Sequence, residues 1–323
     1  MTNTILKKKK EKIPLLQSTA EIVARAREIS DIDEPYYVAV AAAHDDAVIE
    51  AIVNSQKERI AHGILIGDSI KIKELIEQFG ANPDEFKIVH SNSDEESGNI
   101  AARAASTGEA NVILKGILST GKLLKNVLKK EYGLRREGGL LSHTAVLSPK
   151  LYPKLLAVTD GGMIIKPTFE QKIEMIRNSV VVCRAMGIDI PKVVALTPID
   201  RIVKAFPETF EAAALSKMAE RGQIKSCIID GPMSLDTAVY PPTAEYQGIT
   251  SPVAGQADIV LANSIEEANI LAKSLVQFGG ATFAGVILGA NVPIALVSRA
   301  DNAASKLASI ALAVVVAHYI HTR

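Results

Sequence analysis

The chain has 323 residues, of which 48% are hydrophobic and 22% are charged. These fractions are typical of globular proteins and exclude disordered and fibrous classes. At roughly 150 residues per domain, the length predicts two domains. Lysine plus arginine equals aspartate plus glutamate at 36 each, and aromatic residues make up only 4%. Because basic excess and stacking platforms are both missing, we expect a protein that acts on small molecules and binds no nucleic acid.

The first part of the chain alternates short Val-, Ile- and Ala-rich runs with amphipathic segments. Apolar runs bounded by turn residues predict buried strands, and these lie at 37–42, 63–66, 86–89 and 112–114. Segments with helical periodicity lie between them, at 45–57, 70–79 and 94–107. An alternation of strand and helix predicts a mostly parallel sheet with right-handed crossovers and helices on both faces.

The same alternation returns in the second part. Strands are predicted at 145–147, 155–158, 192–196, 226–230 and 259–261, and helices at 169–186, 208–221 and 265–278. Two capping boxes, Thr168 with Gln171 and Ser264 with Glu267, mark helix starts. The expected fold class is α/β, with two doubly wound domains and mostly parallel sheets.

A charged stretch with three glycines at 131–142 is the expected domain boundary, because its apolar residues follow neither the helical nor the strand periodicity. A last strand at 293–297 leads to a helix at 303–320 that is apolar nearly all round, so we expect it in a core or a subunit interface. Its apolar run at 307–320 is shorter than the ~20 residues that span a bilayer. We therefore expect no membrane segment.

The two cysteines, Cys183 and Cys227, are flanked by apolar residues. This pattern favours packed thiols over a disulfide framework. The lysine-rich N-terminus is not followed by the apolar stretch of a secretory signal. The expected location is cytoplasmic.

The first candidate site is the segment 115–122 (KGILSTGK), which follows a predicted strand. A Gly/Ser/Thr turn before a helix presents backbone N–H groups that suit a phosphate. Its spacing resembles a Walker A loop, but Leu123 stands where a Mg²⁺-binding hydroxyl is needed, so we exclude a nucleoside triphosphatase. An ordinary capped turn is the alternative. Lys122 and Lys125 favour an anion, because lysines at a helix start oppose its dipole.

A second polar group, Ser298, Arg299 and Asp301, follows the last predicted strand. Arginine offers a planar fork for phosphate, and serine a neutral donor for an oxyanion. A solvated surface ion pair is the alternative interpretation.

A third candidate, His143, is flanked by Ser142 and Thr144. Histidine can act as a general base. The sequence nearby holds no Cys, Asp or Glu at the spacing of a catalytic triad, which favours a packing or capping histidine. The six histidines form no metal motif, and we expect no metal site. The turns at 230–236 and 251–255 either line a cleft or simply connect elements.

Several motifs, taken in order, resemble the phosphate acetyl/butyryltransferase family. The matching stretches are 115–128, 155–173, 230–236, 251–255, 257–260, 269–273, 279–280 and 298–299. Within that family, Lys122, the stretch 135–139 and the stretch 298–301 are most similar to phosphate butyryltransferases. The likeness extends over nearly the whole chain after its first dozen residues.

The resemblance implies a reversible transfer of an acyl group between acyl-CoA and orthophosphate, with no cofactor other than coenzyme A as a substrate. It implies an isocitrate/isopropylmalate dehydrogenase-like fold with the site in an interdomain cleft, and a homo-oligomer. We expect a first domain of residues 1–138 plus 290–323 and a second domain of residues 139–289. In this order, the C-terminal strand and helix return to the first domain.

The resemblance also implies the residues of the site. The expected phosphate-binding residues are Ser119, Thr120, Gly121, Lys122 and Lys125, together with the arginine of the catalytic group Ser298, Arg299 and Asp301. For CoA or the acyl group, the expected residues are Ser142, His143, Asp236, Pro252 and Asn263.

Two positions depart from the acetyltransferase pattern. Seven residues after Ser298, where those enzymes carry a proposed aspartate base, this chain has Ser305, so Asp301 is the expected base. Lys125 stands where they carry an arginine. A phosphate acetyltransferase, a metal- and NAD-dependent decarboxylating dehydrogenase and a non-catalytic CoA-binding protein remain alternatives.

Overall fold

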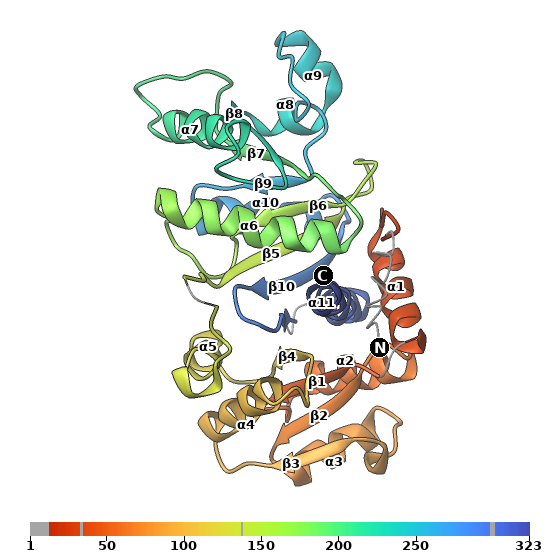
Figure 1. The fold of residues 1–323 in the computed structure, drawn as a ribbon. Helices are drawn as coiled ribbons and strands as arrows, with labels where there is room; N and C mark the ends of the chain where they lie inside the picture. Colours follow the sequence, from red (N-terminus) through yellow and green to blue (C-terminus); the bar gives the residue numbers. More distant parts are fainter. Residues whose placement is uncertain (1–12, 33–34, 137, 298–300) are drawn as a thin grey trace, which may run out of the picture.

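A computed structural model describes residues 13–32, 35–136, 138–297 and 301–323. Its strands form one 11-stranded sheet in the order β3-β2-β1-β4-β11-β10-β5-β6-β9-β7-β8 (Figure 1). The strands are β1 (Tyr37–Ala41), β2 (His62–Gly67), β3 (Lys87–His90), β4 (Val112–Lys115), β5 (Ser142–Ser148), β6 (Leu156–Thr159), β7 (Lys192–Leu196), β8 (Ile228–Met233), β9 (Ile259–Leu261), β10 (Thr282–Leu288) and β11 (Ile294–Leu296).

Helices cover both faces of this sheet (Figure 1). They are α1 (Thr19–Ile32), α2 (Asp46–Lys57), α3 (Ser69–Gln78), α4 (Asp94–Ser106), α5 (Thr120–Val127), α6 (Phe169–Ala185), α7 (Glu208–Glu220), α8 (Leu235–Val239), α9 (Pro241–Tyr246), α10 (Ile265–Gln277) and α11 (Ala303–Thr322), with short 3₁₀ turns at Pro83–Glu85 and Lys130–Tyr132. The α/β fold class expected from the sequence is confirmed.

The two flanks of the sheet differ from its centre. The flanks are parallel, as in the pairs β1–β2, β1–β4 and β7–β9. In the centre, β10 runs antiparallel to both β11 and β5, and β5 runs antiparallel to β6. The strand β10 was not predicted, because Gly285 interrupts its apolar run and a glycine pair precedes it. This missed strand is the one that joins the two flanks.

Side-chain alternation along the strands explains why both faces are covered. Val38 and Val40 of β1 belong to the core cluster that contains α11, whereas Ala39 and Ala41 belong to the cluster that contains α4. All four side chains are fully buried. A strand buried on both faces reads as a continuous apolar run, which is the pattern that predicted these strands.

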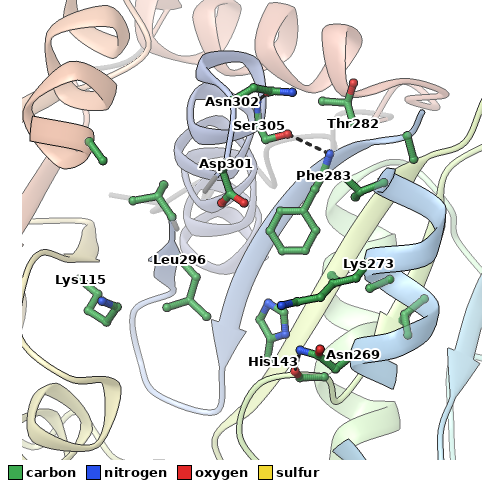
Figure 2. A pocket seen from close by; sticks show the side chains of 18 of the residues that line it. Lys115, His143, Asn269, Lys273, Thr282, Phe283, Leu296, Asp301, Asn302 and Ser305 are labelled. Atoms are coloured by element: carbon green, nitrogen blue, oxygen red, sulfur yellow. Dashed lines mark hydrogen bonds between the residues drawn. The ribbon is translucent and has the colours of Figure 1, made fainter. Parts of the chain in front are cut away.

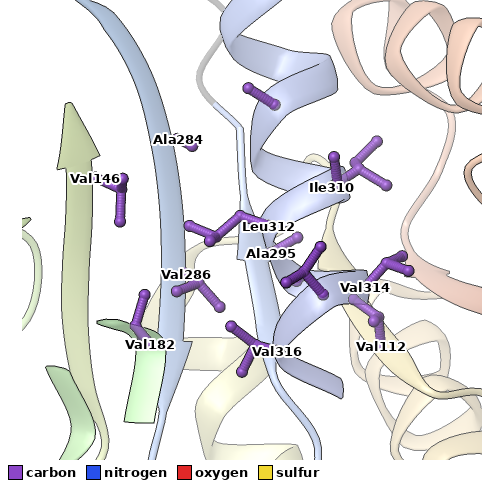
Figure 3. Close-up of a cluster of buried hydrophobic side chains, with 14 of the residues drawn as sticks. Val112, Val146, Val182, Ala284, Val286, Ala295, Ile310, Leu312, Val314 and Val316 are labelled. Carbon is purple, nitrogen blue, oxygen red and sulfur yellow. The ribbon is translucent and has the colours of Figure 1, made fainter. Parts of the chain in front are cut away.

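The C-terminal helix α11 lies in the core, as predicted. It packs against β10, β11, α1 and α2, and its residues from Ile310 to Val314 are 0% exposed. Figure 3 shows its apolar side chains beside those of β10 and β11. By length and composition this 20-residue helix could cross a membrane, which corrects the sequence-based estimate, but 67% of its apolar stretch is buried inside the protein. That burial is typical of a core helix.

The two predicted capping boxes mark real helix starts, but only one of them forms both of its expected hydrogen bonds. Thr168 and Gln171 form the complete capping box at the start of α6. At α10, Ser264 caps the helix through the Glu267 N–H, but the Glu267 carboxylate accepts from the N–H of Asn263. The reciprocal bond has moved by one residue. The division into two domains, 1–138 plus 290–323 and 139–289, stays a prediction.

Candidate active site

A cleft of about 840 Å³ lies at the edge of the sheet where β4 and β11 end (Figure 2). These two strands are parallel neighbours, so their carboxyl ends meet at one edge. The lining comes from the starts of α2, α5 and α11, from the ends of β4 and β11, and from β5, β6, β10 and α10. Carboxyl strand ends facing helix N-termini are where α/β sheets collect their ligands.

One side of the cleft, which we call the loop wall, carries polar groups among apolar ones. Its polar side chains are Asp45, Lys115, Thr120, Asp301 and Asn302, and they lie beside Gly116, Ile117, Leu296 and Val297. The other side, the sheet wall, consists of His143, Ala145, Val158, Ala268, Asn269, Ala272, Lys273, Val276 and Phe283. Figure 2 shows Lys115 and Lys273 on opposite sides of the space.

A close backbone contact shapes the loop wall. The Gly116 N–H donates to Ala41 O at 2.9 Å and the Ile117 N–H to Ala42 O at 3.0 Å. A Cβ at Gly116 would lie 2.0 Å from Ala42 O, so only glycine fits there. The chain thereby turns tightly over the end of β1 and delivers α5 to the cleft.

The predicted phosphate loop contributes to the cleft in part. Ser119 is the N-cap of α5, and its side-chain oxygen accepts from the Lys122 N–H at 3.3 Å. Thr120 lines the cleft. Gly121, Lys122 and Lys125 are exposed and are not among the described lining residues. The Lys122 ammonium lies 3.5 Å from an Asp94 oxygen.

Two lysines among the described lining residues, Lys115 and Lys273, were not predicted to bind the phosphate. Lys115, the last residue of β4, donates to Gly116 O at 3.0 Å and Leu118 O at 3.3 Å, which folds it over the loop. Lys273 extends from α10 into the cleft (Figure 2). Both lysines lie in the motif stretches 115–128 and 269–273, but neither was predicted as a site residue. Their positions in the sequence could have indicated both: Lys115 ends a strand, and Lys273 follows Asn269 at helical spacing.

The start of α11 supplies a carboxylate to the cleft. Asp301 lines it and is half-buried. Ser305, one turn into the helix, is buried, and its hydroxyl accepts from the Phe283 N–H at 3.3 Å (Figure 2). Ser305 therefore ties α11 to β10. Ser298 and Arg299 lie outside the described residues, and their predicted roles stay predictions.

The sheet wall is made mostly of small apolar side chains. Ala145 and Val158 face the cleft from β5 and β6, and Ala268 and Ala272 face it from successive turns of α10. Asn269 donates to Gly161 O at 3.0 Å, which holds α10 against the end of β6. Such a surface offers dispersion contacts and apolar burial, but few hydrogen bonds, to whatever lies against it.

His143 is the polar exception on the buried part of this wall. It is 6% exposed, and burial lowers the pKa of its imidazole, with the Asp160 charge acting in the opposite direction. The ring is therefore neutral at neutral pH. A buried neutral imidazole is a poor general base, because burial disfavours the cation that proton uptake would produce.

The other residues predicted to contact CoA or the acyl group lie away from the described lining. Ser142 is fully buried and accepts from the Asn178 side chain at 2.8 Å. Asn263 accepts from Lys172 at 2.8 Å and donates to Leu196 O. Asp236 and Pro252 are exposed, on α8 and in the loop that follows α9. Of the predicted set, the structure brings His143, Thr120 and Asp301 to one cleft.

Cysteine and metal chemistry find little support in the described residues. Cys183 is buried and Cys227 is half-buried, and both are free thiols. Burial raises the pKa of Cys183, and it raises that of Cys227 to about 11. Neither thiol lines the cleft. No group of three or more His, Cys, Asp or Glu side chains in the described part of the chain is arranged to hold a metal ion.

Comparison with known proteins places the chain in a family. The model of the phosphate acetyl/butaryl transferase family matches residues 95–314. The chain is 44% identical to a phosphate acetyltransferase from Thermotoga maritima (87% of this chain, 95% of the relative). It is 39% identical to a phosphate butyryltransferase from Clostridium beijerinckii (92% of this chain, 97% of the relative).

Solved structures agree. A branched-chain phosphotransacylase from Enterococcus faecalis matches with a TM-score of 0.77 at 28% identity, covering 88% of this chain and 99% of that one. A 4-hydroxythreonine-4-phosphate dehydrogenase from Salmonella typhimurium, with a TM-score of 0.56 at 15% identity over 88% of this chain and 100% of that one, shares the fold alone. The chain belongs to the phosphate acetyl/butaryl transferase family, and it is a phosphate acyltransferase.

Proposed function

We propose that this protein transfers a short acyl group, butyryl in preference to acetyl, between coenzyme A and orthophosphate. The observation that carries the proposal is the pairing of the two walls in one cleft. The loop wall has a cation and a helix start for the phosphate, and the sheet wall has small apolar side chains for the acyl chain. The relatives include both a phosphate butyryltransferase and a phosphate acetyltransferase, so the preference for the longer acyl group rests on the apolar sheet wall.

In the direction of acyl phosphate synthesis, a phosphate oxygen attacks the thioester carbonyl carbon. The C–S bond breaks, and the thiolate of CoA takes up the proton that the phosphate loses. Holding both substrates side by side supplies much of the rate enhancement. The raised pKa values and the positions of both cysteines support direct transfer over an acyl-cysteine intermediate.

Lys115 and the N–H groups at the start of α5 are suited to hold the phosphate. Asp301 exchanges a proton with the CoA sulfur; its position in the cleft, shared with Asp45, and its place in the motif after β11 support this role. In the reverse direction it accepts the thiol proton, which a thiol with an ordinary pKa of about 8.5 must lose to become a nucleophile. Ser298 and Arg299 keep their expected roles toward the oxyanion and the phosphate.

The proposal is tested by measuring free thiol released from butyryl-CoA, acetyl-CoA and isobutyryl-CoA, each with and without phosphate. Trapping with hydroxylamine identifies the acyl phosphate. We expect phosphate-dependent release with a higher kcat/KM for butyryl-CoA than for acetyl-CoA. A higher value for acetyl-CoA would make the protein a phosphate acetyltransferase, and release independent of phosphate would make it a hydrolase.

Asp301→Asn tests the proton exchange. We expect at least a tenfold loss of turnover toward butyryl phosphate and CoA, partly recovered as pH rises and the free thiol ionises on its own. Parental activity at every pH would remove Asp301 from the reaction. The proposal further includes a cytoplasmic location and a homo-oligomer, and size-exclusion chromatography with light scattering tests the second.

A further inference from the structure

His143 stands out in the cleft because its side chain is polar, buried and without a hydrogen bond. It is 6% exposed, and neither Nδ1 nor Nε2 has a hydrogen-bond partner among the residues that the structure describes. Its ring nevertheless lines the cleft (Figure 2). A buried polar group without a partner costs free energy in the folded protein. A ligand that enters the cleft can supply the missing partner.

The position of the ring is fixed by its surroundings. The His143 N–H donates to Asp160 Oδ2 at 2.8 Å, and its carbonyl accepts from the Thr159 hydroxyl at 2.9 Å. Glycines flank the ring: a Cβ at Gly285 would lie 3.0 Å from Nε2, and a Cβ at Gly162 would lie 3.2 Å from Nδ1. Larger side chains at these two positions would press on the imidazole. The fold thus reserves room for it.

The charge state limits what the ring can bind. Because burial lowers the pKa, the imidazole is neutral and offers one N–H donor and one acceptor nitrogen. A neutral ring supplies no counter-charge for phosphate, whereas Lys115 and Lys273 do. Its apolar neighbours Ala145 and Phe283 are suited to an acyl chain. The polar atom nearest to an acyl chain in an acyl-CoA is the carbonyl oxygen of the thioester.

We infer that His143 donates its ring N–H to the carbonyl oxygen of the bound thioester and stabilises the negative charge that forms on this oxygen during transfer. The inference rests on the proposed function and assigns one residue to the acyl carbonyl. When a phosphate oxygen attacks, the C=O π electrons move to the oxygen that accepts the His143 N–H. As the C–S bond breaks, they return to re-form the carbonyl. His143 keeps its proton throughout, so it acts as an electrophilic donor.

The first test compares His143→Leu, which has a similar size and no donor, with His143→Gln, which keeps an N–H donor. We expect His143→Leu to lower kcat for butyryl-CoA plus phosphate by about a hundredfold, the effect of losing one donor to an oxyanion. The KM for phosphate should change less than threefold. His143→Gln should recover at least tenfold of the loss. The melting temperature of His143→Leu should be equal to or above that of the parent, because it removes an unpartnered polar group.

Two results would overturn the assignment. One is a kcat within threefold of the parent in His143→Leu. The other is a lost activity that His143→Gln does not recover, accompanied by a lower melting temperature in both variants, because that result describes a packing residue.

A second readout does not depend on turnover. In protein labelled with ¹⁵N-histidine, the signal absent from His143→Leu identifies the ring nitrogens of His143. Butyryl-CoA without phosphate should shift the donor nitrogen, and free CoA, which has no thioester carbonyl, should not. If butyryl-CoA shifts the His143 signal but the parent protein releases no thiol, the proposed function is wrong and the contact between His143 and the thioester is supported. An equal response to both probes, or none, would exclude the contact even in an active enzyme.

Discussion

The two walls of the cleft differ because they come from different kinds of segment: loops and helix starts that follow strand ends on one side, and paired strands with α10 on the other. The loop wall is built after the last residues of parallel strands, where the chain leaves the sheet and exposes backbone N–H groups and charged side chains such as Lys115 and Asp301. The sheet wall is built from α10 and from the antiparallel strands β5, β6 and β10, where backbone groups are paired and side chains such as Ala145, Val158 and Ala272 face the cleft. The sheet wall is therefore mostly apolar, with Lys273 as its charged residue.

The largest expected effect concerns the backbone that forms the loop wall. Gly116→Ala places a Cβ 2.0 Å from Ala42 O. We expect the free energy of unfolding to fall by about 3 kcal/mol, at the upper end of overpacking effects. Gly121→Ala is the matched control in the same loop, because its Cβ would meet no described atom within 4 Å. Urea denaturation of both variants measures the difference, and equal stabilities would show that the loop adjusts freely.

Removing the cation of the loop wall tests where the phosphate binds. We expect Lys115→Met to lower kcat/KM for phosphate at least tenfold, or about 1.4 kcal/mol. Lys130→Met removes an exposed lysine outside the described lining and should have less than a twofold effect. Initial rates at varied phosphate concentration give both values. An unchanged KM for phosphate in Lys115→Met would show that phosphate does not bind at the loop wall, and the proposed difference between the two walls would be wrong.

Filling the sheet wall tests the acyl pocket. Ala272→Leu adds volume on the face of α10 that lines the cleft. We expect the ratio of kcat/KM for butyryl-CoA to that for acetyl-CoA to fall about tenfold, since one methylene in an apolar pocket is worth roughly 1–3 kcal/mol. Ile270→Phe adds volume on the same helix at a residue that is 65% exposed, and it should leave the ratio unchanged. A ratio that falls equally in both variants would indicate a shift of α10 instead.

The smallest expected effect is the pH dependence of stability. The unfolded chain protonates His143 below its ordinary pKa of 6.5, whereas the folded protein, with a lowered pKa, does not. Parent stability therefore falls as pH drops through 6.5. The nearby charges are Asp160, which raises the pKa, and Lys273, which lines the same cleft.

His143→Leu removes this contribution. We expect it to gain about 1 kcal/mol relative to the parent between pH 7 and pH 5.5, by the linkage between proton binding and folding. Urea denaturation at both pH values measures it. A stability difference that does not change with pH would mean that folding leaves the pKa of His143 unshifted, and one that changes in the opposite direction would mean that the folded protein holds the imidazole protonated, which would exclude the neutral donor.

Local patterns predicted most of the fold. Most strands of the parallel flanks were predicted to within two residues, as in β7 and β9, because each is a short apolar run between turn residues; β8 ends at Met233, three residues beyond its predicted end. The helix α1 was not predicted, although its buried residues Ile22, Ala26 and Ile29 recur at helical spacing, and in the fold it packs against α11. The small helices α8 and α9, next to several prolines, carry no periodicity long enough to read.

For the site, the structure brings some of the predicted residues to one cleft and leaves others outside its described lining. Thr120, His143 and Asp301 share the cleft although they are far apart in the chain. Lys122 and Lys125 were chosen for their place in the loop, but the first turns of α5 direct them to its exposed face. Lys273 was overlooked as a site residue, because nothing local to α10 indicates which of its faces borders a cleft.

The sequence by itself determined the α/β class, the buried C-terminal helix, the turn after β4 and the resemblance to an acyltransferase family. Periodicity, turn residues and ordered motifs are properties of neighbouring residues, so they can be read along the chain. Only the tertiary structure decided which residues meet: the antiparallel insertion of β10 between β11 and β5 brings His143 and Phe283 to face the ends of β4 and β11. Contacts of this kind depend on strand order, and strand order is set by packing between segments far apart in the sequence.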